Sequence, residues 1–93
     1  MKHLSIYISK VENGDRFVKF HFGADEWELP KLFKEFENWL FANVDSIEAG
    51  EWIADIGFSP RESATGGGPI ISTEIMASCL KIGMAIYISE YGE

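Results

Sequence analysis

The start of the chain alternates between apolar and polar side chains, the pattern of strands that bury one face. Within residues 3–22, two alternating runs flank a short polar segment with a glycine, which predicts a β-hairpin. A two-residue loop would place Ile8 opposite Lys19 and mix the two faces. A three-residue loop with Gly14 in the left-handed region pairs Ile8 with Val18 instead and gives one apolar face. We therefore predict the three-residue, bulged turn.

Apolar residues recur at helical spacing in two later segments. Pro30 suits the first turn of one helix, where a missing N–H costs no intrahelical hydrogen bond. Ser72 or Thr73 caps a second helix, which Lys81 and Gly83 end. The side chains predicted to be buried are Leu32, Phe33, Phe36, Trp39 and Leu40 in the first helix and Ile75, Met76, Cys79 and Leu80 in the second.

Two further strands complete the predicted fold. Residues 51–58 and 84–91 alternate, residues 69–71 form a short extended piece, and the glycine-rich residues 59–69 predict a loop. The order is therefore β-β-α-β-(β)-α-β. Two helices on one face of a mainly antiparallel sheet is the simplest two-layer solution for this order. We predict an α+β two-layer sandwich in a single domain, residues 1–93, a length that supports one hydrophobic core.

The net charge of −7 is concentrated in residues 25–62. This segment holds three bases, Lys31, Lys34 and Arg61, against ten carboxylates. A one-sided acidic field repels nucleic acid and raises the association rate with basic proteins at low salt. The carboxylates are Asp25, Glu26, Glu28, Glu35, Glu37, Asp45, Glu48, Glu51, Asp55 and Glu62.

The sheet face that the helices leave uncovered is predicted to be aromatic. Tyrosines beside carboxylates on a rigid sheet suit protein binding, because the rings bring contact area at low entropic cost and the acids select a basic partner. Aromatic residues also favour strands for structural reasons alone. Sheets that bind RNA combine aromatic rings with lysine and arginine side chains that neutralise phosphates. This acidic chain does not favour that combination. The residues assigned to this face are Tyr7, Phe17, Lys19, His21, Glu51, Ile53, Asp55, Tyr87 and Tyr91.

No motif indicates a catalytic centre, a cofactor or a metal. The Gly66–Gly68 run lacks the Gly-Lys-Ser/Thr ending of a phosphate loop, and Cys79, His3 and His21 lack the short paired spacings of zinc sites. Cys79 is expected to be a buried hydrophobe instead of a nucleophile. We therefore predict a protein that is not an enzyme. No apolar run reaches the ~20 residues of a membrane span, and the alternating start does not resemble an export signal, so we expect a cytoplasmic protein.

Residues 69–91 read PIISTEIMASCLKIGMAIYISEY, a serine-capped helix with a Leu-x-x-Gly end followed by an apolar strand. This half of the chain resembles a family of small bacterial domains of unknown function, several of them found beside toxin genes. Trp52 and its strand extend the resemblance to about residue 50. In size and acidity, the whole chain resembles bacterial immunity proteins of contact-dependent inhibition and other polymorphic toxin systems. That resemblance implies a cognate toxin as the partner, and it transfers no catalytic residue.

We predict an immunity or inhibitor protein that neutralises a cognate toxin, expected to be a basic nuclease. A nuclease cleft is positive because it holds phosphates, so an acidic surface can enter it. The residues predicted to bind the partner are Asp25, Glu26, Trp27, Glu28, Phe41, Glu48, Glu51 and Asp55. Two alternatives stay open. One is a regulatory or assembly domain that forms a homodimer through a sheet edge or the aromatic face; the other is a small enzyme with a site near the glycine-rich loop.

Overall fold

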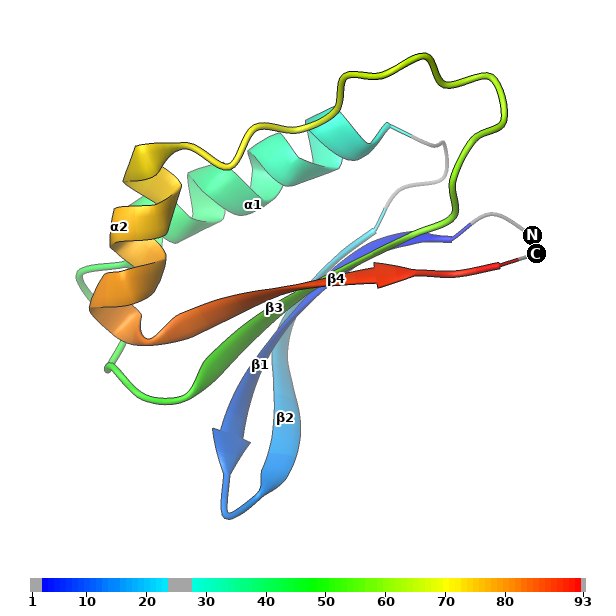
Figure 1. The fold of residues 1–93 in the computed structure, drawn as a ribbon. Helices are drawn as coiled ribbons and strands as arrows, with labels where there is room; N and C mark the ends of the chain where they lie inside the picture. The colour runs from blue at the N-terminus through cyan, green and yellow to red at the C-terminus, as the bar shows by residue number, and fades with distance from the viewer. Residues whose placement is uncertain (1–2, 24–27, 93) are drawn as a thin grey trace.

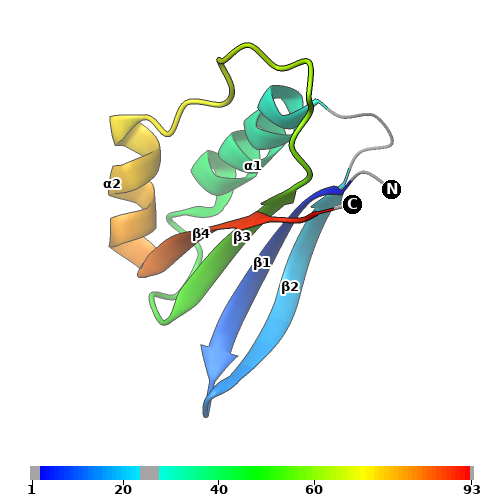
Figure 2. The ribbon, with the colours of Figure 1, turned by 45° about the vertical axis from the view of Figure 1, so that its right-hand side comes forward.

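The structure, a computed structural model, describes residues 3–23 and 28–92. Its elements are β1 (Leu4–Glu12), β2 (Asp15–Gly23), α1 (Leu29–Asn43), β3 (Trp52–Phe58), α2 (Thr73–Ile82) and β4 (Met84–Glu90). The strands form one sheet in the order β2-β1-β3-β4, and both helices cover the same face of it (Figures 1 and 2). β1 is antiparallel to β2 and β3, whereas β3 and β4 are parallel. The predicted α+β architecture is confirmed.

The segment between β3 and α2 has no strand of its own. Residues 59–72 run as an irregular connection, so the extended piece predicted at residues 69–71 does not join the sheet. Together with α2, this segment makes the long crossover that parallel strands need. Gly66, Gly67 and Gly68 have φ angles of 115°, 82° and 133°, a region that side chains with a Cβ rarely adopt. The predicted loop is confirmed.

The hairpin turn differs from the prediction. Asn13 and Gly14 have φ angles of 54° and 84°, and Glu12 pairs with Asp15, so the loop has two residues. Without a correction, this register would mix apolar and polar side chains on each face, and a bulge within β2 prevents this. Ser9 pairs with Val18 and the preceding residue, Ile8, pairs with Phe20, so Lys19 is left out of the pairing.

Helix α1 is held by its apolar stripe more than by its ends. Pro30 lies in its first turn as predicted, while Glu28 precedes the helix without a side-chain cap. The stripe is buried as predicted, although Trp39 is only partly buried and packs its ring 4.8 Å from that of Phe20. The buried side chains of α1 are Leu29, Leu32, Phe33, Phe36 and Leu40.

Helix α2 has the opposite character, with strong signals at both ends and a narrow buried face. The Ser72 hydroxyl accepts a hydrogen bond from the Ile75 N–H at 3.1 Å, and Gly83 ends the helix in the left-handed conformation with φ 77°. Ile75, Cys79 and Ile82 are buried. Met76 and Leu80 were predicted to be buried but are 52% and 83% exposed, because α2 turns only one stripe toward the sheet and α1.

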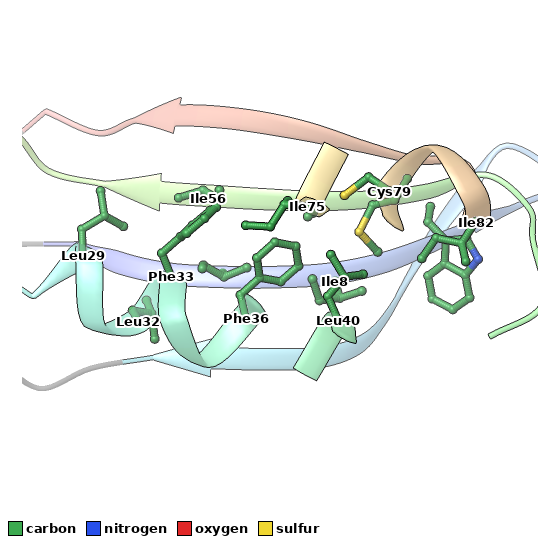
Figure 3. Close-up of a cluster of buried hydrophobic side chains, with 14 residues drawn as sticks. Ile8, Leu29, Leu32, Phe33, Phe36, Leu40, Ile56, Ile75, Cys79 and Ile82 are labelled. Atoms are coloured by element: carbon green, nitrogen blue, oxygen red, sulfur yellow. The ribbon is translucent and has the colours of Figure 1, made fainter. Parts of the chain in front are cut away.

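The hydrophobic core lies between the helices and the covered face of the sheet. Phe33, Phe36 and Leu40 of α1 point toward Ile8 and Ile56 of the strands, and Ile75, Cys79 and Ile82 join them from α2 (Figure 3). Cys79 is buried as predicted, and this burial raises the pKa of its thiol. Within the described residues, no helix is both long and apolar enough to cross a membrane.

Candidate partner-binding face

The open face of the sheet, on the side away from the helices, carries most of the polar and aromatic side chains of the strands. Neighbouring residues of a strand point to opposite faces, so those between the core positions emerge here. The strand register sets one row across all four strands, consisting of His21, Tyr7, Asp55 and Tyr87. Tyr7, Tyr87 and Tyr91 are 38%, 43% and 43% exposed. All the tyrosines of the chain therefore lie half-exposed on this face.

Asp55 occupies the centre of the row, between Tyr7 on one side and Tyr87 on the other. Its Oδ1 accepts a hydrogen bond of 2.6 Å from the Ser89 hydroxyl. Its Oδ2 lies 3.9 Å from Nη1 of Arg16, and the Arg16 guanidinium carbon lies 5.0 Å from the centre of the Tyr87 ring. The centre of the open face thus combines one carboxylate, one guanidinium and aromatic rings.

A glycine on β3 gives two rings room to lie on the sheet. A Cβ at Gly57 would come within 2.7 Å of Cε2 of Tyr91 and 2.9 Å of Nε2 of His3. Those two rings contact each other with centroids 4.1 Å apart and ring planes tilted by 32°, and His3 Nε2 lies 2.8 Å from the Ser5 hydroxyl. Gly57 therefore lets the residue before β1 and the residue after β4 meet over β3.

A second ring pair lies at the opposite side of the same face. Tyr7 of β1 and His21 of β2 stack with centroids 4.4 Å apart and ring planes 19° from parallel. The pair bridges the central and edge strands and holds the Tyr7 ring beside Asp55, its partner on β3. Rings fixed in this way lose little conformational freedom when they bind a partner.

Two residues predicted for the open face are not on it as expected. The bulge in β2 reverses the alternation between Phe20 and Val18, so Phe17 pairs with Lys10 on the helix side and Lys19 is left out of the pairing. Val18 takes the open-face position opposite Ser9. The sequence alone favoured unbroken alternation, and for that reason it misplaced both Phe17 and Lys19.

The other predicted partner-binding residues are scattered over the molecule. Asp25, Glu26 and Trp27 lie outside the described residues. Glu28 is exposed at the start of α1, 3.7 Å from Lys31, and Phe41 is exposed near the end of the same helix. A helix of this length, 15 residues, is about 22 Å long, so Glu28 and Phe41 are far apart.

The predicted partner-binding residues from the second half of the acidic segment also lie in different places. Glu48 is exposed in the connection between α1 and β3. Glu51 immediately precedes β3, where alternation places it on the same face as Asp55. The structure therefore brings two of the predicted carboxylates, Glu51 and Asp55, to the open face and leaves Glu28, Phe41 and Glu48 elsewhere.

Sequence reasoning missed Arg16, Ser89 and His3 as parts of this face. Arg16 belongs to the hairpin end of β2, and its contact with Asp55 joins two strands that are not neighbours in the sheet. The alternation of β4 did contain the signal for Ser89, since it lies between Tyr87 and Tyr91. His3 could have been found in the same way from Ser5 and Tyr7.

The glycine-rich loop borders a shallow hollow on the other side of the molecule. The hollow, of about 240 Å³, lies between α1 and residues 68–70, and its charged lining residues, Lys34 and Glu37, bond to each other at 2.7 Å. In the part of the chain that the structure describes, no group of three or more histidine, cysteine or acidic residues could hold a metal ion.

Comparison with protein-family models, with curated proteins and with solved structures found no significant match to this chain. The resemblances to toxin-associated domains and to immunity proteins therefore stay predictions from the sequence. The features of the molecule that bear on its function are the geometry of the open face and the charge of the chain.

Proposed function

We propose that this protein binds a basic partner protein through the open face of its sheet and inhibits it, as an immunity protein inhibits its toxin. The observation that carries the proposal is the uncovered row of Tyr7, Asp55 and Tyr87 on a rigid sheet. Tyrosines on a preorganised surface are efficient binding residues because they bury area at little entropic cost. If these rings served only to fill a core, another element would have to cover this face.

The charge of the chain supports a basic partner. A net charge of −7 on 93 residues draws positively charged proteins toward the molecule and speeds their encounter at low salt. In this proposal the open face makes the close contacts, and carboxylates around it, including Glu51, supply the long-range attraction. A nuclease toxin, whose cleft is positive because it binds phosphates, fits both requirements.

The proposal is tested by growth rescue. The C-terminal region of the protein encoded immediately upstream is induced in a bacterium with and without this chain, and the two chains are co-purified. We expect rescue and a stable complex. A harmless neighbour, or a toxic one that is neither rescued nor bound, would overturn the immunity function.

Two matched variants locate the binding face. Asp55→Asn with Tyr87→Ala removes one carboxylate and one aromatic ring from the open face. Glu35→Gln with Phe41→Ala removes the same groups from α1, where Phe41 is 42% exposed, close to the 43% of Tyr87. We expect the first variant to lose rescue and the second to keep it. The reverse result would place the partner on α1 instead.

Self-association is the second candidate function, and edge strand β2 favours it. Eight of its nine residues are exposed, with Phe17, Val18 and Phe20 among them. An exposed apolar edge can pair with another strand, although the bulge and the charge of Lys19 oppose regular pairing. Sedimentation velocity over a range of protein concentrations separates the two functions, since a dimer that forms without a partner supports self-association.

A further inference from the structure

The side chain of Arg16 crosses the open face to reach its contacts. Arg16 belongs to β2, whereas Asp55 belongs to β3 and Tyr87 to β4, and β1 lies between β2 and β3. The guanidinium group must therefore extend over β1 to sit beside the Asp55 carboxylate and over the Tyr87 ring. A carboxylate flanked by two tyrosines is a favourable seat for a planar cation, which can form an ion pair and stack at the same time.

The contact that Arg16 makes in this seat is loose. Nη1 of Arg16 lies 3.9 Å from Oδ2 of Asp55, beyond hydrogen-bond distance, and the Arg16 side chain is 48% exposed. The Asp55 side chain is only 23% exposed, and its other oxygen is already held by Ser89. Asp55 is thus fixed in place with one oxygen available for a better donor. Exposed ion pairs of this kind contribute little and are easily exchanged.

We infer that Asp55, Tyr7 and Tyr87 form a recognition seat for an arginine side chain of the partner, and that Arg16 occupies the seat until the partner's arginine displaces it. The inference rests on the proposed function, because it names the group that a basic partner inserts into the open face. A guanidinium suits the seat better than an ammonium, since its planar fork can bond Oδ2 while its face lies on a tyrosine ring. Arg16 therefore acts as an internal competitor that lowers affinity for weakly fitting cations.

Competition between Arg16 and an added arginine side chain can be tested with a matched control variant. Arg16→Gln empties the seat and should strengthen the binding of an added arginine side chain. Lys19→Gln removes the same charge from the same strand, but the Lys19 ammonium lies 5.9 Å from the Phe17 ring, away from Asp55. Both variants change the overall field equally, so a difference between them reports on the seat alone.

The test is an NMR titration of the full chain with the peptide acetyl-Gly-Arg-Gly-amide, using the lysine and citrulline peptides for comparison. We expect backbone amide shifts centred on Asp55, Tyr7 and Tyr87. Affinity for the arginine peptide should be about threefold higher in Arg16→Gln than in the wild type or in Lys19→Gln, the size expected for removing an exposed competing ion pair. Asp55→Asn should abolish binding while keeping an oxygen that accepts the Ser89 hydroxyl.

The inference fails if the arginine peptide leaves these amides unchanged in Arg16→Gln, if Lys19→Gln gains as much affinity, or if the uncharged citrulline peptide binds equally well. These outcomes are distinct from failure of the proposed function. If growth rescue depends on Asp55 but the arginine peptide does not bind, the open face is still the partner surface and the arginine seat is wrong. If the peptide binds but no rescue occurs, the seat stands and the toxin partner is wrong.

Discussion

The two faces of the sheet use the same strands for different purposes. Along β3, Trp52, Ala54 and Ile56 lie against the helices, while the residues between them, Ile53 and Asp55, face the open side, where Ile53 is 5% exposed and Asp55 is partly buried. The covered face is filled by large apolar side chains that pack against α1 and α2. On the open face, Gly57 leaves room for the rings of Tyr91 and His3. The comparison indicates that the large apolar side chains of the covered face define the fold, whereas the candidate site depends on Tyr7, Asp55 and Tyr87 of the open face.

The small residues of the open face are themselves buried. Ser5 and Ser9 of β1 are each 5% exposed, although both helices lie on the other face of the sheet. Ser59, directly after β3, is 1% exposed and its hydroxyl accepts a 2.8 Å hydrogen bond from the His3 N–H, while the Ser5 hydroxyl lies 2.8 Å from Nε2 of the same histidine. In the described residues, no buried side-chain nitrogen or oxygen lacks a hydrogen-bond partner, so these hydroxyls are buried without losing hydrogen bonds.

The strongest way to break the covered face is to remove its central ring. Phe36 is fully buried between α1 and the sheet, so Phe36→Ala deletes its contacts and leaves a cavity (Figure 3). We expect a loss of about 3–5 kcal/mol in the free energy of unfolding, measured by urea denaturation. Phe41→Ala on the exposed side of the same helix is the control and should cost less than about 1 kcal/mol. Similar losses for the two variants would show that the core is not where the structure places it.

On the open face, adding a methyl group at Gly57 should destabilise the fold. Gly57→Ala places a methyl group 2.7 Å from the Tyr91 ring and 2.9 Å from His3 Nε2, so the rings must move. We expect a loss of about 1–3 kcal/mol in the free energy of unfolding, as for overpacking elsewhere. Gly92→Ala, whose added Cβ would have no atom within 4 Å, is the matched control and should be nearly neutral.

The cause of the Gly57→Ala effect can be isolated by removing both rings that contact the added methyl group. In a chain that already carries His3→Ala and Tyr91→Ala, the added methyl group has space, and its cost should fall to roughly a few tenths of a kcal/mol. An undiminished cost in that background would mean that the backbone of β3, and not the ring pair, requires glycine.

The sequence predicted the fold because the fold depends on local periodicity. Alternation located the strands, the Ser72 cap and Gly83 located α2, and Pro30 marked the start of α1. The failures occurred where a single residue changed the register. The bulge at Lys19 is invisible to a pattern that assumes unbroken alternation, and it moved Phe17 to the other face.

The candidate site was predictable only in part, for a related reason. Tyr7, His21, Asp55, Tyr87 and Tyr91 were assigned to the open face correctly, since each follows from strand alternation. The contact of Arg16 with Asp55 joins strands that are not neighbours, and no local pattern contains it. Of the carboxylates predicted to bind the partner, Glu51 and Asp55 lie on the open face, whereas Glu28 and Glu48 lie elsewhere, so closeness in sequence does not bring them together.

An exposed ion pair that lies on neither face of the sheet is expected to have the smallest effect on stability. Lys81 of α2 donates a hydrogen bond to Asp45, which follows α1, and this contact lowers the pKa of the Asp45 carboxyl from its ordinary value of 3.8. A lowered pKa in the folded state means that the carboxylate stabilises the fold above its unfolded pKa. The stabilisation is lost as the pH falls through the folded pKa.

Asp45→Asn should therefore lower the melting temperature slightly at neutral pH and low salt, and the difference from the wild type should shrink as the pH falls below 3.8. High salt should shrink it as well, because both side chains are exposed and screened. Glu35→Gln is the control, since Glu35 is exposed and has no ion-pair partner in the described part of the chain. Thermal unfolding over a series of pH values measures both variants. A difference that grows in acid would contradict the expected sign and exclude the Asp45–Lys81 contact as its cause.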